Sequence, residues 1–156
     1  MATAEATAAG PSAEFVDWFQ AGWAIGARDP EAFFSHIGSR LTADALMTQP
    51  MAAPLRGDAG MRRLFTPLFE AIPDLHGDVV RWGETADGVM VELRLSGTIG
   101  RRPVSWITID RIVLRDGRIA ERAANFDPLP LAWALARSPR AARVMLPALL
   151  RRGGRD

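Results

Sequence analysis

The feature that most constrains this chain is a pair of segments rich in β-branched residues, which flank Arg115-Asp116-Gly117-Arg118. An Asp-Gly pair between two such segments is a strong signal for a β-hairpin. We expect a bulge with glycine in the left-handed conformation, so that Leu114 pairs with Arg118. In that register Asp110 lies opposite Arg122.

One face of this hairpin has the composition of a pocket wall. The same register places Thr108 opposite Ala124 and Trp106 opposite Phe126, because opposed residues share a face of the sheet. A carboxylate and a guanidinium therefore lie on this face among mainly apolar neighbours.

The rest of the chain predicts helices first and strands after them. Ser12 is a suitable cap for a first helix, Asp29-Pro30 starts a second and Gly57-Asp58 a third. Residues 41–49 are ambiguous. After Pro73 apolar residues recur at every second position, which is typical of strands. We therefore predict an α+β domain with three helices packed on one face of a curved, mixed or antiparallel sheet.

Composition defines the expected boundaries. Residues 1–11 are small and polar, and we expect them to be disordered. Residues 12–131 form a single domain, and residues 132–156 form an Arg-rich, helical tail. We predict that the apolar residues near and within this tail close over a pocket or a partner subunit: Leu131, Trp133, Leu135, Val144 and Met145. Contact with an anionic membrane is the less favoured alternative.

Composition also excludes several classes of function. All 19 basic residues are arginine, and a net charge of +1 gives no field that favours nucleic acid. The absence of Cys and Tyr removes thiolate nucleophiles and phenol acids. His36 and His76 have no partner at metal-binding spacing, and no nucleotide-binding motif is present, so we expect neither metal nor cofactor. No segment has the length of a membrane helix or the character of a signal peptide, so a cytoplasmic protein is expected.

The order of elements resembles the nuclear transport factor two-like superfamily, which includes ketosteroid isomerase, limonene epoxide hydrolase and the SnoaL-like polyketide cyclases. The best local matches are Thr48-Gln49-Pro50, Pro54-Leu55-Arg56-Gly57, Ile109-Asp110-Arg111 and Asp116-Gly117-Arg118-Ile119. The resemblance implies a conical pocket between sheet and helices, with its mouth near residues 49–54, and an apolar small-molecule substrate. It also implies a homodimer through the outer sheet face, where we expect Val89, Val91 and Leu93.

The functional residues of these relatives match only in part. The general base of ketosteroid isomerase falls at Gln49, which cannot accept a proton, whereas its hydrogen-bonding Asp matches Asp110. The tyrosine of that enzyme has no counterpart. The functional residues of the epoxide hydrolase fall at Met47, Gln49, Met90, Glu92 and Ala124. Of these only Glu92 keeps an acidic side chain, in place of an aspartate.

We therefore predict a rearranged catalytic group of Glu92, Asp110 and Arg122. An arginine keeps one carboxylate ionised as a base, while a second carboxyl in apolar surroundings keeps its proton and acts as an acid. The predicted substrate-binding positions are Met47, Gln49, Met90, Trp106, Thr108, Phe126 and Asp127.

Each of these assignments has a structural alternative. Asp110 and Arg122 can form a purely structural ion pair, Trp106 can be a core residue, and Asp127 can be a hydrogen-bonding residue at the strand end. Burial of Val91 and Leu93 would leave Glu92 in solvent.

Two functions remain open on the sequence. The first is a cofactor-free enzyme that performs isomerisation, cyclisation or epoxide opening on an apolar small molecule. The second is a non-catalytic binding or dimerising module, because this fold hosts both. Convergence of Glu92, Asp110 and Arg122 in one closed pocket would favour the enzyme.

Overall fold

The structure, a computed structural model, describes residues 10–150. The predicted disorder of residues 1–11 lies almost wholly outside the described residues. Within them the elements, in chain order, are α1 (Pro11–Ile25), the 3-10 helix η1 (Gly26–Arg28), α2 (Pro30–Gly38), β1 (Leu41–Thr48), β2 (Leu55–Arg56), α3 (Gly57–Ala71), β3 (His76–Thr85), β4 (Gly88–Ile99), β5 (Arg102–Arg115), β6 (Arg118–Asn125), α4 (Pro128–Ala136) and α5 (Pro139–Leu150). The prediction of an α+β fold, with helices before most of the strands, is confirmed.

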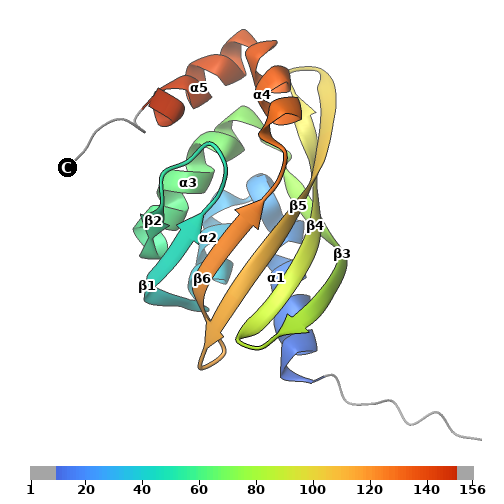
Figure 1. Ribbon diagram of the computed structural model, residues 1–156. Coiled ribbons are helices and arrows are strands. Elements are labelled where there is room, and N and C mark those ends of the chain that lie inside the picture. The colour runs from blue at the N-terminus through green and yellow to red at the C-terminus, as the bar shows by residue number, and fades with distance from the viewer. Residues whose placement is uncertain (1–9, 151–156) are drawn as a thin grey trace, which may run out of the picture.

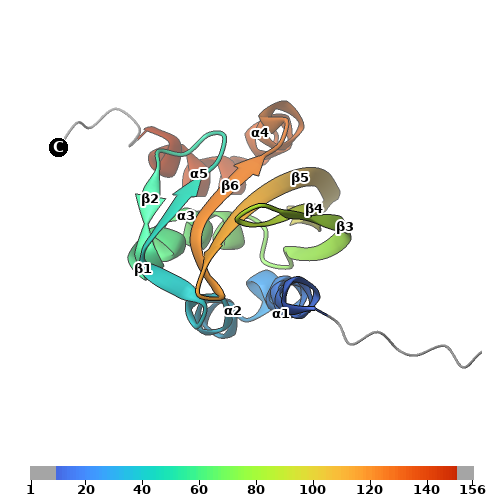
Figure 2. The same ribbon diagram turned by 60° about the horizontal axis from the view of Figure 1, so that its bottom comes forward.

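The strands form one curved, mixed sheet in the order β2-β1-β6-β5-β4-β3 (Figure 1). β1 runs parallel to β6, and the other neighbours are antiparallel. Figure 2 shows the sheet curving around α3, with α1 and α2 on the same side of it. The pair α4–α5 covers one end, where α5 contacts α3 and α4 contacts β5. The described part of the predicted tail therefore packs on the domain.

The central hairpin turns through a two-residue loop. Asp116 and Gly117 both have positive φ angles, 53° and 72°, and Arg115 pairs with Arg118. Positive φ at both loop positions is the signature of a type I′ turn, which matches the twist of the flanking strands. The predicted glycine bulge in the turn is wrong.

An irregularity between Val113 and Leu114 shifts the pairing of β5 and β6 further. As a result Asp110 pairs with Ala124, and not with Arg122 as predicted. The error is two residues. Because side chains alternate with a period of two, this even shift leaves Asp110 and Arg122 on their predicted face, whereas the one-residue shift next to the turn, where Leu114 pairs with Ile119, does not.

The apolar residues of β4 face the helices. Val89, Val91 and Leu93 have no exposed surface, so our prediction that they lie on the outer sheet face is wrong. The helices cover this side of the sheet, and burial of branched side chains against them decides which face of β4 turns inward. Their partners in the core include an aromatic cluster of Phe15, Phe19, Trp23, Phe33, Phe34, Phe65 and Phe69.

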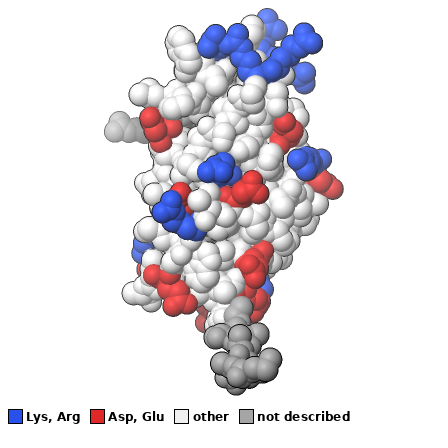
Figure 3. Space-filling model, turned by 90° about the vertical axis from the view of Figure 1, so that its right-hand side faces the viewer, with Lys and Arg blue, Asp and Glu red and all other residues white. Residues whose placement is uncertain are grey.

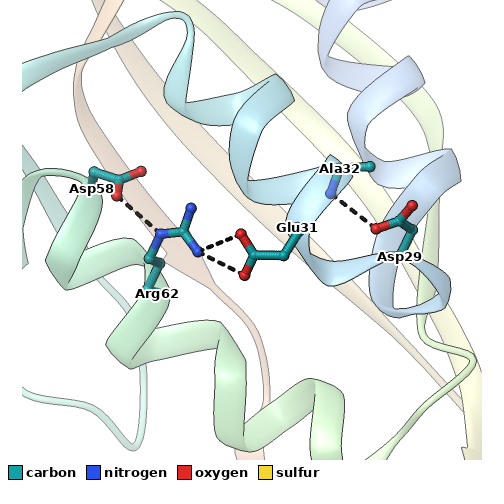
Figure 4. A network of polar contacts seen from close by, with 5 residues as sticks. All are labelled: Asp29, Glu31, Ala32, Asp58 and Arg62. Carbon is teal, nitrogen blue, oxygen red and sulfur yellow. Dashed lines mark hydrogen bonds and ion pairs between the residues drawn. The ribbon is translucent and has the colours of Figure 1, made fainter.

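Polar contacts fix the short helix α2. Asp29 accepts a hydrogen bond from the backbone N–H of Ala32 at 3.0 Å, which confirms it as the N-cap. Arg62 of α3 forms ion pairs with Glu31 of α2 and with Asp58 in its own first turn (Figure 4). Ser12, by contrast, does not cap α1, which begins at Pro11 after Gly10.

No described helix is both long and apolar enough to span a bilayer.

Candidate active site

A cavity of about 710 Å³ lies between the sheet and α3, beneath α4 and α5. Residues 49–55 line it, including the segment where we predicted the mouth. Its remaining wall comes from α3, from the inner faces of β4, β5 and β6, and from the two C-terminal helices. The cavity is large enough for a drug-sized ligand, and its lining is mainly apolar.

The C-terminal helices supply part of this lining. Leu131, Val144 and Met145 line the cavity and Leu135 is buried, as predicted. Trp133 was predicted to join them, but it is 67% exposed. The helical repeat explains the error, because residues 131 and 135 share the inner side of α4 and residue 133 lies away from it.

The sheet contributes a buried ion pair to the cavity wall. Arg122 Nε donates to Asp110 Oδ2 at 2.6 Å, and the two side chains are 7% and 0% exposed. Thr108 donates from its hydroxyl to Asp110 Oδ1 at 2.8 Å. Thr108 and Arg122 line the cavity, whereas Asp110 does not. The carboxylate therefore lies behind two polar side chains.

Two N–H donors in this wall have no partner within the described residues. They are Arg122 Nη1 and Trp106 Nε1, and both atoms are buried. The Arg122 guanidinium carbon also lies 5.5 Å from the ring centroid of Phe65, which gives that side of the group only a weak, cation–π contact. A buried donor without an acceptor is costly, so a ligand oxygen in this region would be stabilised.

Glu92 does not join the pair. It forms an ion pair with Arg81, from Oε2 to Nε at 2.8 Å, and pairs with Ile109 on the outer sheet face. Our placement of Glu92 in the pocket is therefore wrong, and the alternative in which Val91 and Leu93 are buried is correct. Met90 shares that outer face and is 43% exposed, so its predicted place in the pocket is also wrong.

The other predicted binding residues divide into two groups. Gln49, Trp106, Thr108 and Phe126 line the cavity, together with Arg122. Met47 and Asp127 do not: Met47 is buried in the core, and Asp127 is exposed and accepts a hydrogen bond from the backbone N–H of Leu129 at 3.0 Å. Asp127 is the N-cap of α4, which agrees with its alternative as a strand-end residue.

Sequence reasoning missed the charged residues that α3 brings to the cavity. Glu70, Arg62 and Arg63 line it, and Glu70 is the one carboxylate that does so among the described residues. Hydrogen bonds to Glu31 and Asp58 raise the pKa of Arg62. Residues 63 and 70 are seven apart, so the helical repeat was the signal for a shared charged side.

Within residues 10–150, no three His, Asp or Glu side chains form a group that could hold a metal ion.

The fold and the cavity define an α+β domain of the nuclear transport factor two-like kind. The model of the SnoaL-like domain family matches residues 15–122, more than half of the chain. The chain therefore belongs to the SnoaL-like family. No curated protein matches it significantly.

Solved structures agree with this assignment. A protein assigned as a SnoaL-like polyketide cyclase from Jannaschia sp. CCS1 has a TM-score of 0.70 and 17% identity, over 86% of this chain and 100% of that one. An epoxide hydrolase from M. tuberculosis, similar to limonene epoxide hydrolase, has a TM-score of 0.62 and 19% identity, over 86% and 96%. PrhC from Penicillium brasilianum NBRC 6234 has a TM-score of 0.72 and 14% identity, over 89% and 98%. Identities this low show a shared fold alone.

Proposed function

We propose that this protein is an enzyme that performs acid–base chemistry, without a cofactor, on an apolar small molecule bound in the cavity. The observation that carries the proposal is the buried Asp110–Arg122 pair in an otherwise mainly apolar wall. Isomerisation, cyclisation and epoxide opening, the reactions we considered from the sequence, all combine a proton transfer with charge development on a substrate oxygen.

In this proposal Arg122 stabilises the oxygen. Its Nη1 is buried without a partner, and the residue lines the cavity. A fixed donor in a site of low dielectric stabilises developing negative charge more strongly than water does, because no reorganisation is needed. The substrate is therefore an apolar molecule that carries a carbonyl or another oxygen acceptor.

Asp110 accepts the proton through Thr108. The carboxylate has no surface in the cavity, but Thr108, whose hydroxyl donates to Asp110, is one of the residues that line it. The substrate proton moves to the Thr108 oxygen while the proton of Thr108 moves to Asp110. Arg122 supplies the positive charge beside that carboxylate.

A second candidate function is a non-catalytic ligand-binding module. The burial of Asp110 favours it, because both carboxylate oxygens already have protein partners and Glu92 lies on the other face of the sheet. In this candidate the pair only orients Arg122 toward a ligand oxygen.

The test begins with a thermal-shift screen of polycyclic ketones, quinones and epoxides, because a ligand that binds the native state raises Tm. Turnover of any stabilising compound is then compared in Asp110→Asn, Arg122→Leu, Thr108→Val and the wild type. Removal of a positioned acid or base lowers the rate by about 10²–10⁴, and we expect losses in this range for Asp110→Asn and Thr108→Val.

Glu92→Gln is the matched control, since it removes a carboxylate from the opposite face of the sheet. It should keep the rate within about threefold, well outside the effect of a lost acid or base. If folded Asp110→Asn also stays within about threefold, the acid–base proposal is wrong. Binding without turnover of any compound would support the module.

We also propose that the protein forms a homodimer through the outer face of β3, β4 and β5. Three large apolar side chains on the outer face of β4 and β5 are 39–43% exposed: Met90, Ile107 and Ile109. Figure 3 looks onto the side of the molecule where β3 and β4 lie, and shows broad uncharged areas between a few charged side chains. A group of exposed apolar side chains on one face is typical of interfaces.

A further inference from the structure

We propose that the outer side of α4 and α5 binds the surface of an anionic lipid bilayer. The surface consists of the exposed apolar residues Leu129, Trp133 and Leu146 and the arginines around them; we call it the C-terminal surface.

The apolar part of the C-terminal surface is unusually exposed. Leu129, Trp133 and Leu146 are 73%, 67% and 53% exposed, more than any other large apolar side chain in the described part of the chain. Leu129 and Trp133 are four residues apart and so share one side of α4, opposite the side that carries buried Leu131. Leucine and tryptophan are the residues that interfacial helices insert among lipid headgroups.

The charged part is basic throughout. Residues 128–147 contain Arg137, Arg140 and Arg143 and no acidic residue. Arg101 in the turn between β4 and β5 and Arg102 at the start of β5 add to this charge. The turn lies beside the α4–α5 connection, since a Cβ on Gly100 would be 3.8 Å from Ser138 Oγ. Basic side chains gather at this end in Figure 3.

None of these five arginines forms an ion pair with another described residue. Arg137 instead lies over the ring of Trp133, with 5.9 Å between its guanidinium carbon and the ring centroid. The charges are therefore free to meet an external anionic surface. An anionic bilayer attracts such clusters over about a Debye length.

Charge also decides between a bilayer and a second copy of this chain. A two-fold dimer through the C-terminal surface would bring the same basic surface of both copies together. Arginines of one copy would then meet arginines of the other, which is unfavourable. Anionic headgroups neutralise them, and the acyl region accepts Leu129 and Trp133.

Binding through the C-terminal surface would also hold the cavity close to the membrane. Leu131, Val144 and Met145 on the inner sides of the same helices line the cavity, so only the thickness of α4 and α5 separates it from the bilayer. An apolar substrate dissolved in the membrane would then be concentrated at the site. This last step rests on the proposed function, but the binding itself does not.

The experiment is co-sedimentation of the full chain with vesicles of phosphatidylcholine alone and of phosphatidylcholine mixed with phosphatidylglycerol. We expect binding to the mixed vesicles only, and weaker binding as salt is added. Each arginine near an anionic surface contributes roughly a factor of five, so Arg137→Gln/Arg140→Gln/Arg143→Gln should lower the partition coefficient on the order of 100-fold. Leu129→Ser/Trp133→Ser should also weaken binding.

Trp82→Ser/Arg94→Gln is the control, because it removes the same kinds of side chain from β3 and β4, outside the C-terminal surface, and should not change binding. Far-UV circular dichroism checks that each variant is folded. Absence of binding to anionic vesicles at low salt overturns the proposal. So does equal binding to both vesicle types, or self-association that Trp133→Ser abolishes, which would make a second copy the partner. Vesicle binding is measured without turnover, so the membrane proposal can be tested even if the enzyme proposal fails.

Discussion

Removing one member of the Asp110–Arg122 pair should destabilise the protein more than removing both. Asp110→Leu leaves a buried guanidinium without its carboxylate, and Arg122→Met leaves a buried carboxylate without its cation. The Asp110→Leu/Arg122→Met variant leaves neither charge. Its apolar side chains contact the wall that already contains Phe65 and Trp106.

The structure sets the expected size of each effect. The side chains are 0% and 7% exposed and 2.6 Å apart, so water screens neither charge. Separating a buried pair costs about 3–5 kcal/mol. We expect the lower figure, about 3 kcal/mol, because Arg122 borders a cavity that can admit water. For a domain of this size that corresponds to a decrease in Tm of about 6–12 °C. The double variant should lie within about 1 kcal/mol of the wild type, since apolar replacement of a buried pair is often neutral.

The measurement is urea unfolding at neutral pH, followed by tryptophan fluorescence and by circular dichroism. The outer-face pair Arg81–Glu92 provides a matched control, because its side chains are 75% and 22% exposed. Arg81→Met or Glu92→Leu should each cost less than about 1 kcal/mol. Two results would refute the reasoning: a cost below about 1 kcal/mol for either single variant, or a double variant as unstable as the sum of both.

Two further predictions concern other parts of the fold. Burial alone would raise the pKa of Asp74, but hydrogen bonds from the Thr98 hydroxyl and backbone N–H outweigh it and leave the pKa below the usual 3.8. The ionised Asp74 carboxylate stabilises the folded protein fully above pH 3.8, and this stabilisation is lost as the pH falls through the lower pKa of the folded state. The loss of unfolding free energy in Asp74→Asn, measured by urea unfolding, should therefore become smaller in acid. A loss that stays constant with pH would contradict this. On the outer sheet face, Ile109→Arg should convert a dimer to a monomer in light scattering, and a monomeric wild type at tens of micromolar would contradict the dimer.

Local pattern was sufficient to place the ion pair on one face. The hairpin was recognisable from Asp116-Gly117, and Asp110 and Arg122 stayed on the same face although the register was wrong by two residues. Period-two alternation makes this outcome robust, because only an odd error exchanges the faces. The type of turn and the irregularity beyond it depend on backbone detail that the sequence does not specify.

Alternation alone does not say which face of a strand is covered. For β4 the apolar side carried Val91 and Leu93, and the polar side carried Glu92. Burial free energy favours the apolar side, yet positions matched to a relative with low identity suggested the opposite. The hydrophobic pattern was the better guide. Met90 was misplaced for the same reason.

Long-range pairing was the other feature that the sequence did not reveal. Residues 41–49 were ambiguous, and most of them form β1 beside β6. Arg118 donates two hydrogen bonds to the carbonyl oxygen of Leu41, at 3.1 and 2.7 Å, across a separation of 77 residues. A parallel partner at such a distance along the chain leaves no local pattern.

The position of Asp110 behind the wall also narrows the chemistry that the proposal allows. A carboxylate without surface in the cavity cannot attack a substrate directly, and its oxygens already accept from Thr108 and Arg122. Epoxide opening of the acid-assisted kind needs a carboxyl that donates to the epoxide oxygen within the cavity, and in this cavity that group would have to be Glu70 of α3 and not Asp110. Enolisation needs only a proton acceptor reached through Thr108 and a donor for the enolate oxygen, the role that the proposal gives to Arg122. Isomerisation or cyclisation of a carbonyl compound therefore fits this wall better than epoxide opening does.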